Sequence, residues 1–485
     1  MISCVFNISE GFQRFKLAER RGVLEDIYRR YKVNKKNQLD LWLAVVVKLF
    51  LFVALFCPIS TTMAGSKHKV YYQEFLLVNA VILVFMLLYL IATIVYKRWN
   101  QENKVFCIKY LIAILSYGFF YWLMMDHIQW KWQGVNAMVS FGFFLLLMCG
   151  ENREWVEKYH VIEFANRSII ISNLIGIVVY LRGYASVYWY NFKFRLMLPQ
   201  AQYGEKRFDW IYYHKSQYAF MLLLSLAFIL IYRHKFINRI TFGLSVAVLM
   251  IGLYISHVNV AIVGGGLILG SFVLDLVIKN FKKINKKVMM IGIPVCLVAV
   301  AAVGFALFTK IAAERSVATL GSRTYIWKNI IKHILAHPEG LGNDFATVKF
   351  ELPELYGALV NNGHNIFLNE MLRFSIPVGV CFIILFALIV IYSLEKKFSF
   401  FTLGIWGAVM MSVSMDYAVM VSGWTLMLFF FYMIFFLDIR KQENDALEKL
   451  PGECDETKIN RKIDSKTGKH DENRFSKEAV PNGNR

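Results

Sequence analysis

Several hallmarks of secreted and metal-dependent proteins are missing from this sequence. None of its cysteines lies in the two long polar connections at 182–215 and 309–373, so no disulfide framework is indicated. No Cys and His residues have the spacing of a zinc site, and we expect neither a metal nor a cofactor. Residues 1–38 lack the early apolar core of a cleavable signal peptide. Internal repeats are also absent, which argues against a secondary transporter.

Apolar residues, by contrast, are abundant along the whole chain. Of its 485 residues, 57% are hydrophobic and 16% aromatic, and long uncharged runs recur. No soluble domain of this size needs so much apolar surface, so we predict a polytopic, all-α integral membrane protein. The formal net charge of +20 does not indicate nucleic-acid binding, because the basic residues cluster in short segments between apolar runs, as the positive-inside rule predicts.

About twelve apolar segments are long enough to span a bilayer, at roughly 20 residues per span. They are predicted at 39–57, 75–96, 105–125, 134–150, 166–182, 216–232, 238–256, 258–279, 288–308, 374–394, 399–415 and 418–437. The short connections rich in Lys and Arg, above all 279–287, fall on the same side as the basic N-terminus. We therefore expect both termini in the cytoplasm and the two long connections on the outer face.

The sequence divides into three parts. Residues 1–38 are basic and cytoplasmic, and form either an amphipathic helix on an anionic leaflet or a disordered segment. Residues 39–437 make up the membrane domain. Residues 438–485 contain few apolar side chains, so we predict a disordered cytoplasmic tail.

The first outer loop, at 182–215, combines basic and aromatic residues. Arg182 and Arg207 stand among aromatic side chains such as Tyr184 and Trp189. Basic residues on an outer loop run against the positive-inside rule, so a role other than topology is expected to retain them. An anionic ligand with an apolar or sugar portion would suit this combination. An interfacial aromatic belt with basic headgroup contacts is the alternative.

The second outer loop contains a predicted amphipathic helix at 322–337. Ser322 is the expected N-cap, and two rows of apolar residues, one of isoleucines and one that begins at Trp327, form its apolar side. Arg323 precedes Trp327 by four residues and so belongs to this membrane-facing side. It is placed either to meet a substrate at the bilayer surface or merely to snorkel from an interfacial helix.

A turn and the polar start of the next span complete this loop. Pro338 ends the amphipathic helix, and Gly340 and Gly342 allow a tight turn. Further along, His364 and Asn365 stand shortly before the next predicted span, which puts His364 at the expected membrane surface. A surface histidine that caps a helix is the alternative interpretation.

The motif order of this loop resembles the O-antigen ligase/polymerase superfamily, which contains the Wzy-type polysaccharide polymerases and the lipid A-core ligases. The motifs are Arg323, Trp327, Gly340-Leu341-Gly342 and His364-Asn365-x-x-Leu368. The resemblance covers about residues 320–380, and the rest of the chain matches in layout. The first half departs from the family: residues 256–259 contain no arginine where many members carry a Ser/Arg motif.

The resemblance implies a metal-independent, GT-C-like glycosyltransferase at the outer face of a bacterial cytoplasmic membrane. Its donor and acceptor would be oligosaccharide repeat units on undecaprenyl pyrophosphate, joined into capsule, exopolysaccharide or O-antigen. A flippase and a chain-length regulator of the same pathway would be its partners.

The same resemblance implies roles for individual residues. His364 would act as general base on the acceptor hydroxyl, because the pKa of histidine lies near the working pH. Arg323 would bind the leaving pyrophosphate through its guanidinium fork. Substrate binding would involve Arg182, Arg207, Asn365, Trp327, Gly340 and Gly342, with Asn365 also able to orient the His364 ring.

Three other functions stay open from the sequence. A ligase of the same superfamily would transfer the finished glycan to a different acceptor, and no feature separates it from a polymerase. A lipid-linked oligosaccharide flippase or other transporter would keep its charges inside the bundle and its loops short, unlike this chain. A non-catalytic membrane scaffold is the third.

Overall fold

The computed structural model describes much of the unit Met1–Leu437. The described residues are 36–57, 61–62, 69–70, 72–96, 99–124, 131–190, 193–199, 208–212, 214–236, 238–280, 322–342, 350–352, 357–360, 363–415 and 424–437. Three predicted features lie outside these residues, namely the N-terminal segment up to residue 35, the span at 288–308 and the tail at 438–485.

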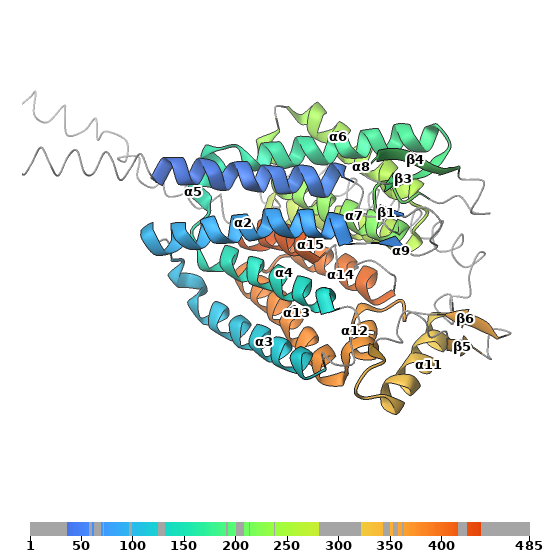
Figure 1. Ribbon diagram of the computed structural model, residues 1–485. Coiled ribbons are helices and arrows are strands. Elements are labelled where there is room, and N and C mark those ends of the chain that lie inside the picture. The colour runs from blue at the N-terminus through green and yellow to red at the C-terminus, as the bar shows by residue number, and fades with distance from the viewer. Residues whose placement is uncertain are drawn as a thin grey trace, which may run out of the picture. The chain divides into compact units, whose positions relative to one another are not determined.

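Helices dominate the described part (Figure 1). A first helix, Lys36–Phe56, is followed by α2 (Tyr72–Tyr96), α3 (Lys104–Leu123), α4 (Lys131–Cys149), α5 (Arg153–Lys158), α6 (Val161–Leu181), α7 (Lys215–Ile231), α8 (Arg239–Ile255), α9 (Asn259–Asn280), α11 (Arg323–Ala336), α12 (Ile366–Phe374), α13 (Ile376–Lys396), α14 (Phe400–Met415) and α15 (Trp424–Phe431), which continues as a π-helical turn, Tyr432–Phe436.

Five of these helices are long and apolar enough to cross a membrane by length and composition, at Lys36–Phe56, Gln101–Leu123, Val161–Leu181, Asn259–Lys279 and Ile376–Lys396. Six shorter apolar helices lie within α2, α4, α7, α8, α14 and the stretch Thr425–Phe436. Each predicted span within the described residues coincides with one of them, and for the last span, predicted at 418–437, the described part from Trp424 onward is helical up to Phe436. An α-helical membrane protein is thus confirmed, while the number of twelve spans stays a prediction.

The distribution of buried and exposed side chains fits a bundle in lipid. On α3, Leu115 is 63% and Trp122 65% exposed, although both are large and apolar. Such surfaces are unfavourable in water but match the hydrocarbon of a bilayer. In contrast, α7 is buried along all of Ser216–Leu230 and packs against α8, α9, α14 and α15, so it lies at the centre of the bundle.

A glycine allows α9 and α14 to pack closely. A Cβ atom added at Gly404 of α14 would lie 1.9 Å from Oγ of Ser271 and 3.2 Å from the carbonyl oxygen of Leu267, both on α9. Only a residue without a side chain fits this contact. Small residues serve helix association in membranes in the same way, because they let backbones approach each other.

Short strands appear in the loops, where none was predicted. A sheet of order β2-β1-β3-β4 contains β1 (Thr61–Thr62), β2 (Lys69–Val70), β3 (Tyr184–Tyr190) and β4 (Lys193–Pro199), and β5 (Phe350–Leu352) pairs with β6 (Ala358–Val360). The parallel pairing of β1 with β3 joins the segment after the first helix to the segment after α6, which requires both to leave the bundle at the same end. The sheet and the α11–β6 region lie at this end in Figure 1.

Candidate functional site

The amphipathic helix α11 forms at the predicted position and buries the predicted row. Ile326, Ile330 and Ile334 are buried and pack around Leu372 of α12. The second row is less buried, since Trp327 is partly covered while Ile331 and Leu335 are exposed. The 3.6-residue repeat correctly put the isoleucines on one stripe, but the apolar side was expected to face the membrane, whereas this stripe packs against α12. The stripe fastens α11 onto α12.

The start of α11 differs in one respect from the expectation. Ser322 occupies the N-cap position, but its backbone has a left-handed φ of 72° and its side chain makes no capping hydrogen bond. The end agrees, because the helix stops at Ala336 and His337 forms the C-cap immediately before Pro338. A side-chain N-cap normally requires an extended backbone, which Ser322 does not have.

The turn after α11 packs on the junction between α12 and α13. Gly340 has a φ of 84° and Gly342 a φ of 49°, as a tight turn of glycines predicts. A Cβ atom at Gly340 would lie 2.8 Å from the backbone nitrogen of Ser375. The backbone nitrogen of Leu341 also donates to the carbonyl oxygen of Leu372, at 2.7 Å. Packing is therefore enough to explain Gly340, whatever its proposed role in substrate binding.

His364 stands on a short backbone segment that neighbouring side chains hold. Its φ of 45° is left-handed, which is uncommon for a residue with a side chain. Directly before it, the carbonyl oxygen of Gly363 accepts a hydrogen bond from Trp327 Nε1 at 3.0 Å. The amide of Gly363 donates to Oδ1 of Asn369 at 2.7 Å. Trp327 of α11 thus links directly to the segment that carries His364.

Asn365 is the N-cap of α12. Its Oδ1 accepts hydrogen bonds from the backbone nitrogens of Phe367 (3.0 Å) and Leu368 (3.1 Å). Its Nδ2 donates to the carbonyl oxygen of Ser414 on α14, at 3.2 Å. Both ends of the amide therefore hold backbone, which satisfies donors at the start of one helix and an acceptor at the end of another.

Arg323 reaches the same end of α14. Its Nε donates to the carbonyl oxygen of Met415, the residue after Ser414. The last carbonyl groups of a helix have no partners within the helix and carry a partial negative charge, so they attract a guanidinium. The C-terminal end of α14 thereby brings together Arg323 and Asn365. Nothing in the local sequence pointed to α14 as their common partner.

Of the two basic candidates of the first loop, only Arg182 belongs to the described residues, and its contacts do not include this cluster. Arg182 is the C-cap of α6, and its exposed side chain makes no hydrogen bond or ion pair with the residues that the structure describes. Arg207 lies outside the described residues. A contribution of these two arginines to substrate binding stays a prediction.

The sequence analysis assigned no functional role to Glu370, a buried carboxyl group on α12. Glu370 is 8% exposed and lies near the hydroxyl of Tyr117 on α3 and the guanidinium of Arg373. Burial raises the pKa of Glu370 to about 7, although the nearby Arg373 and Tyr117 oppose the shift. The sequence signal is weak: Glu370 precedes Phe374 by four residues, and the Phe374 ring lies against Tyr121 of α3. This spacing puts Glu370 on the same helix face.

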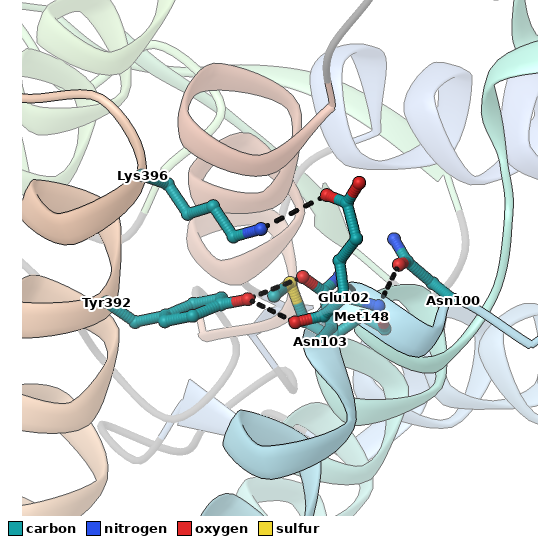
Figure 2. A network of polar contacts seen from close by, with 6 residues as sticks. All are labelled: Asn100, Glu102, Asn103, Met148, Tyr392 and Lys396. Atoms are coloured by element: carbon teal, nitrogen blue, oxygen red, sulfur yellow. Dashed lines mark hydrogen bonds and ion pairs between the residues drawn. The ribbon is translucent and has the colours of Figure 1, made fainter.

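A second polar cluster lies at the other end of α13 and was also missed (Figure 2). Tyr392 donates to Oδ1 of Asn103 at 2.6 Å, and Asn103 Nδ2 donates to the carbonyl oxygen of Met148 at 2.9 Å. Lys396 forms an ion pair with Glu102 at 3.2 Å. These contacts join α13 to the start of α3 and the end of α4, so we call them the α3–α4–α13 network.

No protein-family model matches the chain, and no curated protein matches its sequence. Within the described residues, no group of three or more His, Cys, Asp or Glu side chains is arranged to hold a metal ion. Support for a function comes instead from the motif order and from the meeting of α11, α12 and α14.

Proposed function

We propose that this protein is a polysaccharide polymerase of the membrane, which joins oligosaccharide repeat units carried on undecaprenyl pyrophosphate. The reaction would take place at the outer face of a bacterial cytoplasmic membrane, without a metal ion. Both termini would then lie in the cytoplasm, and the loop end of the bundle that contains α11 and α12 would face outward.

The observation that carries the proposal is the meeting of Arg323 and Asn365, with His364 beside it, at the end of α14. Arg323 is 92 residues from Met415 in sequence, and Asn365 is 49 residues from Ser414. A base and a cation that act on one substrate must come from segments that meet in space. The contacts of Arg323 with Met415 and of Asn365 with Ser414 support such a meeting for Arg323 and for His364, which directly precedes Asn365.

The proposed reaction is a glycosyl transfer. The acceptor hydroxyl attacks the anomeric carbon of the donor, and His364 accepts the hydroxyl proton as the new C–O bond forms. The C–O bond to the lipid pyrophosphate breaks, and the electron pair leaves with the pyrophosphate. Arg323 stabilises the negative charge that grows on this leaving group, through charge-assisted hydrogen bonds.

The exposed face of α11 suits a lipid-linked substrate. Leu335 is 70% exposed and Ile331 44% exposed, on a helix whose neighbouring isoleucine stripe is packed against α12. An amphipathic helix with such a free apolar row fits the interface between headgroups and acyl chains. Arg323 would then lie at the depth where the pyrophosphate of a polyprenyl lipid is found.

The test is turnover of the purified protein in lipid with a defined undecaprenyl-pyrophosphate-linked repeat unit. We expect a ladder of polymer from the wild type. His364→Ala should lower the rate of polymer formation by about 10²–10⁴-fold, because general-base catalysis is typically worth that much. Single repeat units should stay on their lipid.

His333→Ala is the matched control, since His333 is a histidine of the same outer loop that has no role in the proposed chemistry. It lies in the last turn of α11. This variant should polymerise at close to the wild-type rate. Normal polymer from His364→Ala would refute the assignment. Movement of the lipid-linked unit between leaflets without any new glycosidic bond would identify a flippase, and transfer only to a different acceptor would identify a ligase.

A further inference from the structure

The geometry points to Asn369 as a positioning residue: it holds the backbone of His364 in the conformation from which the imidazole ring can act as the base. This inference rests on the proposed function, because it concerns how His364 is presented to the acceptor hydroxyl. Asn369 belongs to the second turn of α12, outside the motif order, and the sequence assigned it no role.

The conformation of His364 needs support from its surroundings. Its φ of 45° is one that side-chain-bearing residues rarely adopt, and such a conformation persists only where neighbouring contacts determine it. Downstream, the capping bonds of Asn365 hold the chain at the start of α12. The support on the upstream side comes from Gly363.

Both backbone groups of Gly363 are bound by side chains from two different helices. Its carbonyl oxygen accepts from Trp327 Nε1 of α11 at 3.0 Å. Its amide donates to Oδ1 of Asn369 at 2.7 Å, the shorter of the two bonds. Gly363 is buried, so water cannot replace a lost hydrogen bond to its amide, and an unbonded amide there would destabilise the protein. Asn369 is therefore the residue that satisfies this buried donor.

The choice of asparagine at position 369 is not explained by the helix itself. Asparagine is a mediocre helix former in a helix interior, because its side chain competes for backbone hydrogen bonds. Here the side chain reaches back across six residues to the segment before the helix. Asn369 is thus suited to fixing Gly363, and through it His364, rather than to extending α12.

The consequence is a specific kind of catalytic defect. Without the acceptor at position 369, the Gly363 amide loses its partner and the His364 backbone can leave its left-handed conformation. A base displaced by about 1 Å from the hydroxyl it must deprotonate loses on the order of 10²-fold in rate. Asn369 itself would not contact the substrate, so the effect should fall on kcat and not on KM.

The experiment compares Asn369→Asp with Asn369→Leu in the full-length protein. Aspartate keeps an oxygen acceptor in the same place, whereas leucine has a similar size and no acceptor. Asn329→Leu is the matched control, because Asn329 Nδ2 makes a comparable bond, 2.7 Å long, to the carbonyl oxygen of Glu351 in β5 and not to the His364 segment. All three are measured for turnover of the lipid-linked repeat unit and for amide hydrogen exchange of the peptide that contains residues 363–368.

For Asn369→Leu we expect faster exchange across residues 363–368 and a kcat lower by about 10–10²-fold, with KM within about threefold of the wild type. Asn369→Asp and Asn329→Leu should behave like the wild type in both measurements. Unchanged exchange in Asn369→Leu would overturn the inference, and so would faster exchange with an unchanged kcat. If the wild type itself forms no polymer, the proposed function fails, whereas the exchange data still decide whether Asn369 fixes the segment.

Discussion

The two ends of α13 carry polar clusters of different kinds. At one end, the α3–α4–α13 network pairs a lysine with a glutamate and a tyrosine with an asparagine (Figure 2). At the other end, α12 leads to the cluster in which Arg323 and Asn365 bond to backbone carbonyl oxygens of α14. With 21 residues, α13 is about 30 Å long, so its two ends are that far apart.

The two clusters differ in whether a charged side chain contacts an opposite charge or an uncharged backbone group. In the network, the charge of Lys396 is opposed by the carboxylate of Glu102, so the cluster is internally neutral. The contact between Arg323 and Met415 is with an uncharged carbonyl oxygen, so the guanidinium charge is not cancelled by it. Neutral, mutually satisfied groups hold helices together, whereas a positioned cation is suited to an anionic substrate. Substitutions at three positions test this comparison.

The largest effect is expected at Arg323. Arg323→Ala should lower the rate of polymer formation by about 10²–10³-fold, because the pyrophosphate loses a contact that strengthens as the bond breaks. Arg323→Lys keeps the charge but loses the planar fork, so it should be strongly impaired as well. Turnover of the lipid-linked repeat unit measures both. A wild-type rate for Arg323→Lys would show that no bidentate contact is made.

The network should respond in stability and not in turnover. Asn103→Leu removes the donor to the carbonyl oxygen of the buried Met148. It also removes the shorter of two bonds of the half-buried Tyr392 hydroxyl, which keeps the carbonyl oxygen of Glu102 as an acceptor at 3.3 Å. Leaving buried polar groups without partners costs about 1–3 kcal/mol. We expect a lower apparent Tm of the detergent-solubilised protein, with the activity per folded molecule unchanged.

Ser116→Ala on the same helix is the control for this change. Its hydroxyl donates only to the carbonyl oxygen of Ile112, one turn earlier on α3. The apparent Tm should therefore stay within the error of the wild type. A drop in turnover of the folded Asn103→Leu protein would mean that the two ends of α13 are coupled, and the contrast between them would fail.

The smallest effect is expected at Glu370, the buried acid at the α12 end. Because burial raises its pKa to about 7, the folded protein keeps this proton at pH values where the unfolded chain, with the ordinary value of 4.5, has lost it. Stability from this group therefore falls as the pH rises from about 4.5 to 7 and stays lower above that range. Glu370→Gln cannot ionise, so it should be more stable than the wild type at pH 8.

At pH 5 the two proteins should unfold at nearly the same temperature. Glu351→Gln, an exposed carboxyl on β5, is the matched control and should show no such pH-dependent difference. Thermal unfolding at the two pH values provides the measurement. An equal difference between Glu370→Gln and the wild type at pH 5 and at pH 8 would contradict the argument.

Much of the fold followed from local patterns. The helices lie where the apolar runs lie, because a segment without polar side chains in lipid must satisfy its backbone groups internally. The buried stripe of Ile326, Ile330 and Ile334 followed from a 3.6-residue repeat, and the end of α11 followed from Pro338. The pairing of Thr61 with Trp189 did not follow, because it connects residues far apart in the chain. The aromatic residues of the first outer loop were assigned to the binding of an anionic, sugar-bearing ligand or, alternatively, to an interfacial belt, although the same residue types favour strands.

For the candidate site, residue identities came from the motif order and their meeting came from the fold. Arg323, Trp327, His364 and Asn365 were chosen by chemistry and spacing, and hydrogen bonds of Arg323, Trp327 and Asn365 join separate segments of the site. The bond of Asn369 to Gly363 and the burial of Glu370 had no comparable signal. The amino-acid sequence does not show whether an asparagine or glutamate side chain faces water or a neighbouring helix.

Hydrophobicity and helical periodicity act between near neighbours in the chain, so the amino-acid order was enough to place the helices, their apolar faces and the turn at Gly340. The carbonyl groups of Ser414 and Met415 became partners of Asn365 and Arg323 only because α14 ends beside α11 and α12. That proximity depends on how all the helices pack at once. Packing joins residues that are distant in the chain, and no local rule specifies which helix end a given polar side chain will meet.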